Sequence, residues 1–206
     1  KSDQIENVEL LPGYCLKSHF SRKHHRKGGV AIFVAENLVE YTEPIDISQH
    51  CEELLCEMSL IQIKRNRTHL NILGIYRPPD ANIDEALNKL SSAIDTTKIE
   101  NSQTLIMGDI NIDILKPNRK MIKLNEILAS HNIHRLNLPP TRITMLSSTS
   151  IDCICTNIME EKITSKVIEA GLSDHTAQIC TILTELPAKQ PIKVCRSLQL
   201  ENPCTN

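Results

Sequence analysis

Short apolar runs bounded by turn residues dominate the hydrophobic pattern of the chain. The run 30–34 follows Gly28-Gly29 and contains Val, Ala, Ile and Phe, which is typical of a buried β-strand. The runs 55–63 and 69–76 are separated by five polar residues, a spacing that predicts an antiparallel hairpin. Four later segments have the same character and are also predicted as strands: 104–107, 151–156, 163–169 and 177–183.

Two segments carry apolar residues at helical spacing instead. Ala and Leu residues recur at this spacing over 84–93. Over 119–130, Met121, Leu124 and Leu128 line one face, and Asn118 is suited to cap the first turn. The resulting order is a strand pair, a helix, a strand, a helix and three strands. This order favours an α/β or α+β sandwich of two packed sheets with flanking helices.

Composition narrows the class of protein. The chain has 206 residues, of which 40% are hydrophobic and 23% charged, as in a globular domain. We expect this domain to occupy residues 1–186 and a linker-like, proline-containing tail to occupy 187–206. No apolar run approaches the roughly 20 residues that span a bilayer, so we expect a soluble protein without a membrane partner. Eight cysteines without a C-x-x-C pair favour a reducing compartment, nuclear or cytoplasmic, over secretion.

Charge limits how the chain could bind nucleic acid. The net charge is −2, so binding would need a local basic patch rather than an overall field. Aromatic residues make up 2% and Trp is absent, which excludes a base-stacking platform. The basic run 22–27 fits a contact to DNA phosphates and a solvated loop about equally well. Cys153 and Cys155 share one face of a strand and have no second pair at zinc spacing, so we interpret them as core thiols.

Polar side chains follow the ends of several predicted strands, where functional residues concentrate. Asp109 and Asn111 follow 104–107, and in an extended segment both would point to the same side; taken alone, the pair is more often a simple turn. An EF-hand is excluded because Ile114 replaces the required Gly and Lys120 the bidentate Glu. Oxygen ligands of this kind suit Mg²⁺ and a phosphate ester.

An acid and an imidazole stand side by side near the end of the domain. Asp174-His175 could simply cap a turn, whereas His175 could titrate near neutral pH. Asp152 lies in an otherwise apolar run, where an ionised carboxylate needs a partner. A histidine would serve as that partner.

Five short motifs occur in this order along the chain: Ile75-Tyr76-Arg77-Pro78-Pro79, Gly108-Asp109-Ile110-Asn111, Pro140-Thr141-Arg142, Ser150-Ile151-Asp152-Cys153-Ile154 and Gly171-Leu172-Ser173-Asp174-His175. Taken together, these motifs resemble the endonuclease/exonuclease/phosphatase family. The likeness is greatest to the apurinic-type endonuclease domains of non-LTR retrotransposons and covers about residues 12–186. The resemblance implies a four-layer α/β sandwich of two mainly antiparallel sheets flanked by helices. It also implies hydrolysis of DNA phosphodiesters with Mg²⁺ or Mn²⁺, in an element that carries a reverse transcriptase.

The resemblance also implies roles for individual residues. Asp109 would orient or deprotonate the attacking water, with Asn111 beside the phosphate. His175, oriented by Asp152, would contact the scissile phosphate, and Tyr76 would donate to a phosphate oxygen. The remaining matches are Asp174 as a metal-side carboxylate, and Arg77 and Arg142 as contacts to nucleic acid.

One departure from the family pattern affects the expected activity. Family members open with a strand that bears an Asn and a second strand that ends in a metal-binding Glu, and both precede the segment where this sequence begins. Glu6 and Glu9 lie in a polar stretch that does not replace them. We therefore expect a domain without its first one or two strands, and weak or absent turnover. The alternatives are a non-catalytic remnant of the fold and a family phosphatase acting on a small or lipid phosphate ester.

Overall fold

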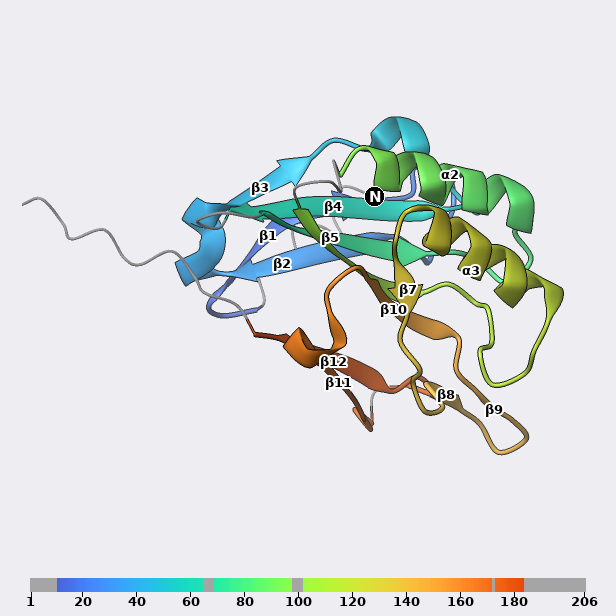
Figure 1. The fold of residues 1–206 in the computed structure, drawn as a ribbon. Helices are drawn as coiled ribbons and strands as arrows, with labels where there is room; N and C mark the ends of the chain where they lie inside the picture. Colours follow the sequence, from blue (N-terminus) through green and yellow to red (C-terminus); the bar gives the residue numbers. More distant parts are fainter. Residues whose placement is uncertain (1–10, 65–68, 98–101, 172, 184–206) are drawn as a thin grey trace, which may run out of the picture.

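A six-stranded mixed sheet forms the centre of the structure (Figure 1). The computed structural model describes residues 11–64, 69–97, 102–171 and 173–183. The sheet has the order β3-β4-β5-β6-β10-β7; β5 and β6 run parallel, and the other neighbours antiparallel. In that order the strands are β3 (Thr42–Ile45), β4 (Glu57–Lys64), β5 (His69–Tyr76), β6 (Ser102–Asp109), β10 (Asp152–Thr156) and β7 (His134–Arg135).

Two α-helices, α2 (Ile83–Asp95) and α3 (Arg119–Ser130), cover one face of this sheet (Figure 1). Their apolar sides pack on a buried cluster that includes Leu73 and Ile106 of the sheet, and Cys153 and Cys155 belong to the same cluster. Asn118 caps α3 as predicted, because its side chain accepts a hydrogen bond from the Met121 N–H. Both helices and the interpretation of the two cysteines as core thiols are confirmed.

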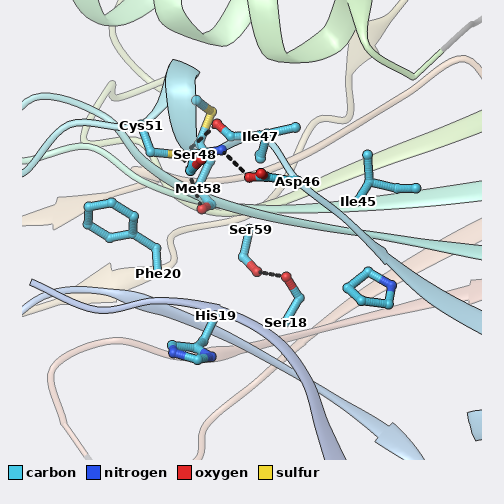
Figure 2. A pocket seen from close by; sticks show the side chains of 11 residues that line it. Ser18, His19, Phe20, Ile45, Asp46, Ile47, Ser48, Cys51, Met58 and Ser59 are labelled. Carbon is cyan, nitrogen blue, oxygen red and sulfur yellow. Dashed lines mark hydrogen bonds between the residues drawn. The ribbon is translucent and has the colours of Figure 1, made fainter. Parts of the chain in front are cut away.

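Two hairpins lie on the opposite face of the sheet. They are formed by β1 (Tyr14–Phe20) with β2 (Val30–Ala35), and by β11 (Ile163–Ile168) with β12 (Ala177–Ile182). A second buried cluster fills the space beneath them and includes Ile61, Leu105 and Ile154. The Ser18 and Ser59 hydroxyls also meet across the two layers at 2.6 Å (Figure 2). The short elements are η1 (Glu36–Tyr41), η2 (Ser48–His50), η4 (Glu160–Lys162), β8 (Arg142–Ile143) and β9 (Ser148–Thr149).

The predicted α/β class with mainly antiparallel sheets is confirmed. Two details differ from the expected four layers: the second strand layer consists of separate hairpins, and the described α-helices both lie on one face of the sheet. The strands β1 and β3 were not predicted from the sequence. Glu6, Glu9 and the tail 187–206 lie outside the described residues. None of the helices in the described part of the chain is long and apolar enough to span a bilayer.

Gly108 allows β5 and β6 to approach closely at the end where the polar residues gather. Its φ angle is +143°, and a Cβ built on it would lie 1.9 Å from the carbonyl oxygen of Ile75, its partner on β5. Only glycine tolerates both the backbone conformation and this distance. Gly108 therefore fixes the spacing between the strand that carries Tyr76 and the strand that carries Asp109.

We expect Gly108→Ala to lower the free energy of unfolding by about 3 kcal/mol, because the methyl group would push β5 away from β6. Gly13→Ala is the matched control: Gly13 also has a positive φ, +82°, but an added Cβ would meet nothing within 4 Å. This control should cost only about 1 kcal/mol. Urea denaturation followed by circular dichroism measures both, and equal losses would contradict the close-approach explanation.

Candidate active site

Strand register aligns four polar residues in a row at one end of the six-stranded sheet. Glu57 pairs with Tyr76, Tyr76 with Asp109, and Asp109 with Asp152. Directly paired residues project from the same face of a sheet. Gly74, two residues before Tyr76 on β5, lies against β2, so the row projects toward the hairpin layer. Residues from four strands are thereby gathered at one edge.

Asp152 joins this row to the loop before β12. Its Oδ2 lies 3.2 Å from Nδ1 of His175. An ionised carboxylate only accepts hydrogen bonds, so Nδ1 carries the proton and Nε2 is left for another partner. The Thr141 hydroxyl oxygen accepts from the N–H groups of Ile151 and Asp152, each at 3.1 Å. The structure thus brings Asp109, Asp152 and His175 together, as expected from the sequence.

The turn after β6 is shaped by Asp109 and Asn111. The Asn111 N–H donates to Oδ1 of Asp109 at 3.0 Å, and Asn111 adopts a φ of +52°. Its side-chain amide donates to the Arg77 carbonyl at 2.8 Å. The segment is therefore a turn rather than extended, so strand alternation does not place both side chains on one side as predicted. The turn instead aims one backbone N–H at the Asp109 carboxylate.

The pKa of the Asp109 carboxyl is raised, first because the group is largely buried and second because Asp152 is negatively charged beside it. The Asn111 N–H and the nearby His175 oppose the rise. Burial and a neighbouring like charge both disfavour ionisation. A carboxylate in this state is a better proton acceptor than one in water, which suits a general base.

Arg77 supports the turn from beneath. Its side chain is buried, and Nε donates to the Ile110 carbonyl at 2.8 Å. The terminal nitrogens donate to the carbonyls of Ala81 at 3.1 Å and Asn111 at 3.0 Å. These contacts occupy the guanidinium inside the protein, so the structure gives Arg77 a supporting place and not the exposed contact to nucleic acid that we expected.

Arg142 and Asp174 form an exposed pair beside His175. Nε of Arg142 lies 2.7 Å from Oδ2 of Asp174, and both side chains are more than 40% exposed. The hydrogen bond from Arg142 lowers the pKa of the Asp174 carboxyl. Arg142 and His175 are bridged through their backbones, which places the pair at the rim of the row. Arg142 is therefore exposed at this rim.

Two buried charged residues were missed by the sequence reasoning. Arg135 donates to the carbonyls of Ile112, Ser150 and Asp152 at 2.9–3.0 Å. Glu57 is fully buried and begins the row. A charged residue inside an apolar run is the available signal for Glu57, as it is for Asp152, whereas the mixed segment 131–137 around Arg135 carries no such signal.

The basic loop 22–27 lies near the same end of the sheet. The Glu53 carboxylate accepts from the N–H groups of Lys23, His24 and His25. His25 Nδ1 also lies 2.8 Å from Glu53, and these hydrogen bonds, that of the His25 ring above all, hold the pKa of Glu53 at about 2. Residues 23–27 of the loop are exposed but anchored, which agrees with a solvated loop and still leaves basic side chains near the row.

Two hollows adjoin these elements. The larger, about 500 Å³, lies between β2 and the ends of β5 and β6 and reaches Tyr76 and Asp109. The smaller, about 230 Å³, lies between β1 and the segment 44–51 (Figure 2). In the smaller one, Asp46 and Cys51 are already hydrogen-bonded to neighbouring backbone groups. The larger hollow is the one connected to the row.

Comparison with known proteins agrees with this geometry. Residues 70–179, more than half of the chain, match a family described as Endonuclease-reverse transcriptase. The chain belongs to this family. No curated protein matches the chain at a significant level.

Solved structures show the same fold at low sequence identity. The endonuclease domain of TRAS1, a telomere-specific non-LTR retrotransposon, aligns with a TM-score of 0.68 and 14% identity, over 89% of this chain and 91% of that one. A humanized D. rerio TDP2 gives 0.61 and 13%, over 89% and 82%. The 3′ phosphatase NExo from Neisseria gives 0.54 and 11%, over 89% and 94%. The fold of an endonuclease-reverse transcriptase protein is thus shared by nucleases and phosphatases.

The carboxylate oxygens in the row are ligands of the type that a hard divalent cation binds. Asp109 and Asp152 are carboxylates on paired positions, and the negative charge of Asp152 raises the pKa of Asp109. A cation nearby would relieve that repulsion, and Mg²⁺ commonly binds through one or two carboxylates with water and phosphate oxygens. Within the described ranges, no group of three or more His, Cys, Asp or Glu side chains is placed to hold a metal. Asp174 is paired with Arg142 instead of completing such a group.

We expect Asp109→Asn to make the protein more stable at neutral pH. The raised pKa means that the ionised carboxylate is disfavoured in the folded protein. This cost is absent below the unfolded-state pKa of about 3.9, where the carboxyl is protonated in both states, and is complete above the folded-state pKa. Asn keeps the oxygen that accepts from the Asn111 N–H. Denaturation in urea at pH 7 and pH 3, without divalent metal, should show a gain only at pH 7; an equal gain at both would contradict the assignment.

Proposed function

We propose that this domain hydrolyses phosphodiester bonds in DNA with the help of Mg²⁺ or Mn²⁺. The observation that carries the proposal is the placement of Asp109 beside the Asp152–His175 pair on adjacent strands. A proton acceptor next to an oriented imidazole at a rigid sheet edge is what this hydrolysis needs. Membership of the Endonuclease-reverse transcriptase family supports the same reaction class.

Each residue of the row has a role that its contacts make possible. Asp109 accepts a proton from the attacking water or orients it, because burial and Asp152 raise its pKa. When its imidazole carries a second proton, His175 donates from Nε2 to a phosphate oxygen while Nδ1 donates to Asp152. Tyr76, beside Asp109 in the row, donates from its phenol to a second phosphate oxygen. Asn111 acts through its backbone N–H, because its amide is held by Arg77.

A divalent cation would supply charge stabilisation for the phosphate as negative charge grows around phosphorus. Asp109 and Asp152 are the carboxylates best placed to hold it, with Asp174 available at the rim once released by Arg142. Arg142 would then contact a DNA phosphate, as expected from the sequence. We also propose that the domain works in the nucleus or cytoplasm as part of an element that carries a reverse transcriptase, in line with the family description.

Two other functions use the same fold. A non-catalytic remnant would keep the row without turnover. A phosphatase acting on a small ester is also consistent with the fold, because a 3′ phosphatase is among the similar structures. The family match favours the nuclease over the phosphatase.

We expect the protein to nick supercoiled plasmid in the presence of Mg²⁺ or Mn²⁺, and Asp109→Asn to lower the rate by about 100-fold or more, because the proton acceptor is lost. Asp95→Asn is the control: Asp95 is an exposed acid on α2, on the far side of the six-stranded sheet. Gel electrophoresis of the plasmid measures the rates.

Equal nicking by the protein and Asp109→Asn would rule the assignment out. Release of phosphate from small esters with the plasmid left intact would favour the phosphatase instead. Absence of both reactions with either metal would favour the non-catalytic remnant.

A further inference from the structure

Arg22 is a nearly buried arginine that no step of the proposed reaction uses. It lies just past the end of β1, and its side chain is 8% exposed. Nε is 2.6 Å from Oε1 of Glu57, and the guanidinium carbon is 5.7 Å from the centre of the Tyr76 ring. At this distance an arginine interacts with the face of an aromatic ring. One guanidinium thus links a buried carboxylate to the ring of Tyr76.

Glu57 holds the guanidinium rigidly. It is the strand partner of Tyr76, and its carboxylate also accepts from the N–H groups of Gly29 at 2.6 Å and Leu54 at 3.1 Å. Three donors on one buried carboxylate leave it little freedom to move. Because Glu57 and Tyr76 are fixed on adjacent strands, the arginine between them has one preferred position.

Gly28 leaves the room that the guanidinium occupies. Its φ is +90°, and a Cβ built on it would lie 2.4 Å from the guanidinium carbon of Arg22. One guanidinium nitrogen reaches toward the Arg26 carbonyl at 3.4 Å. The loop 22–28 therefore surrounds the side chain of Arg22, its first residue. The contact of Arg22 with the Tyr76 ring belongs to the same arrangement.

A contribution to stability alone does not explain this arrangement well. Replacing a buried ion pair by apolar residues is often neutral or stabilising, so the pair is weak evidence for a purely structural role. A phenol that must meet a phosphate oxygen, in contrast, requires close positioning, because misplacement by about 1 Å can cost about 100-fold in rate. Because Glu57 holds the guanidinium of Arg22 near the Tyr76 ring, Arg22 is suited to fixing the position of that ring.

We propose that Arg22, oriented by Glu57, is a positioning residue that holds the ring of Tyr76 in its place in the row. The catalytic consequence rests on the proposed function, whereas the placement of the ring does not. The two parts are therefore tested by separate measurements.

Tyrosine spectroscopy tests the placement directly. The chain has three tyrosines and no Trp, so Tyr76 is the sole tyrosine signal after Tyr14→Phe and Tyr41→Phe. In that background we expect Arg22→Met to weaken the near-ultraviolet circular dichroism of Tyr76 and to raise acrylamide quenching of its fluorescence at least twofold. Arg26→Met removes a positive charge from the same loop, where the side chain is exposed, and should change neither signal.

Arg22→Lys keeps a cation for Glu57 but lacks the planar group that lies over the ring. It should give an intermediate change, and it carries the test if Arg22→Met does not show a cooperative melt. Unchanged dichroism and quenching in a folded Arg22 variant would overturn the proposal.

Plasmid nicking tests the consequence for catalysis. Arg22→Met should lower kcat by roughly tenfold with little change in KM. In a Tyr76→Phe background the same substitution should have less than a twofold effect, because the phenol it positions is gone. Equal losses in both backgrounds, or a rise in KM alone, would overturn the positioning role. If the ring responds to Arg22 but the unaltered protein does not nick DNA, the placement stands and the proposed function fails.

Discussion

Register between neighbouring strands decides which side chains meet at the end of the six-stranded sheet. β5, β6 and β10 pair so that Tyr76, Asp109 and Asp152 stand next to one another. A shift of one residue in β6 would turn Asp109 toward the helices and bring Gly108 or Ile110 into its place. The two buried clusters, one on each face, oppose such a shift, because it would exchange their members. The register is therefore fixed by the same alternation that forms the core.

Buried arginines then fix the loops that leave this end of the sheet. Arg77 and Arg135 together donate to carbonyls in the turn after β6, in β10 and in the loop before it. Hydrogen bonds from charged donors are stronger than neutral ones, and a guanidinium serves several carbonyls at once. The carbonyls of the irregular backbone at residues 110–112 thereby each accept a hydrogen bond from a charged donor. Asp109, whose ionised form burial and Asp152 disfavour, needs such support.

How much of this could be predicted depends on the distance along the chain between interacting groups. The strand at 69–76 and the helix at 119–130 follow from local patterns of apolar residues, and the Asn118 cap lies within one turn of its partner. β3 was missed because it contains Pro44 and few apolar residues; it is an edge strand, where proline is tolerated. Arg22 and Glu57 are 35 residues apart, and no local pattern connects them.

The candidate site residues also divide into those that the sequence predicts and those that depend on distant parts of the chain. Asp109, Asp152 and His175 were predicted because each follows or begins a recognisable strand, and the resemblance to a family placed them together. Arg77 stands in an equally suggestive position after β5, yet its side chain turns inward to the Ile110 carbonyl. The sequence identifies which residues reach the edge of the sheet. It does not show the direction of the Arg77 side chain, because that direction depends on carbonyls in the turn after β6 that have no partner in a strand ladder.

Differences in burial divide the site into a fixed part and a changeable part. The side chains of Asp152 and His175 are 9% and 31% exposed, so solvent screens their interaction only in part. Those of Arg142 and Asp174 are both more than 40% exposed, and exposed pairs of that kind contribute little to stability. A phosphate that approaches Arg142 therefore has little to overcome in replacing Asp174. The Asp152 end of the Asp152–His175 pair stays in place because the Asp152 backbone is held by Thr141 and Arg135.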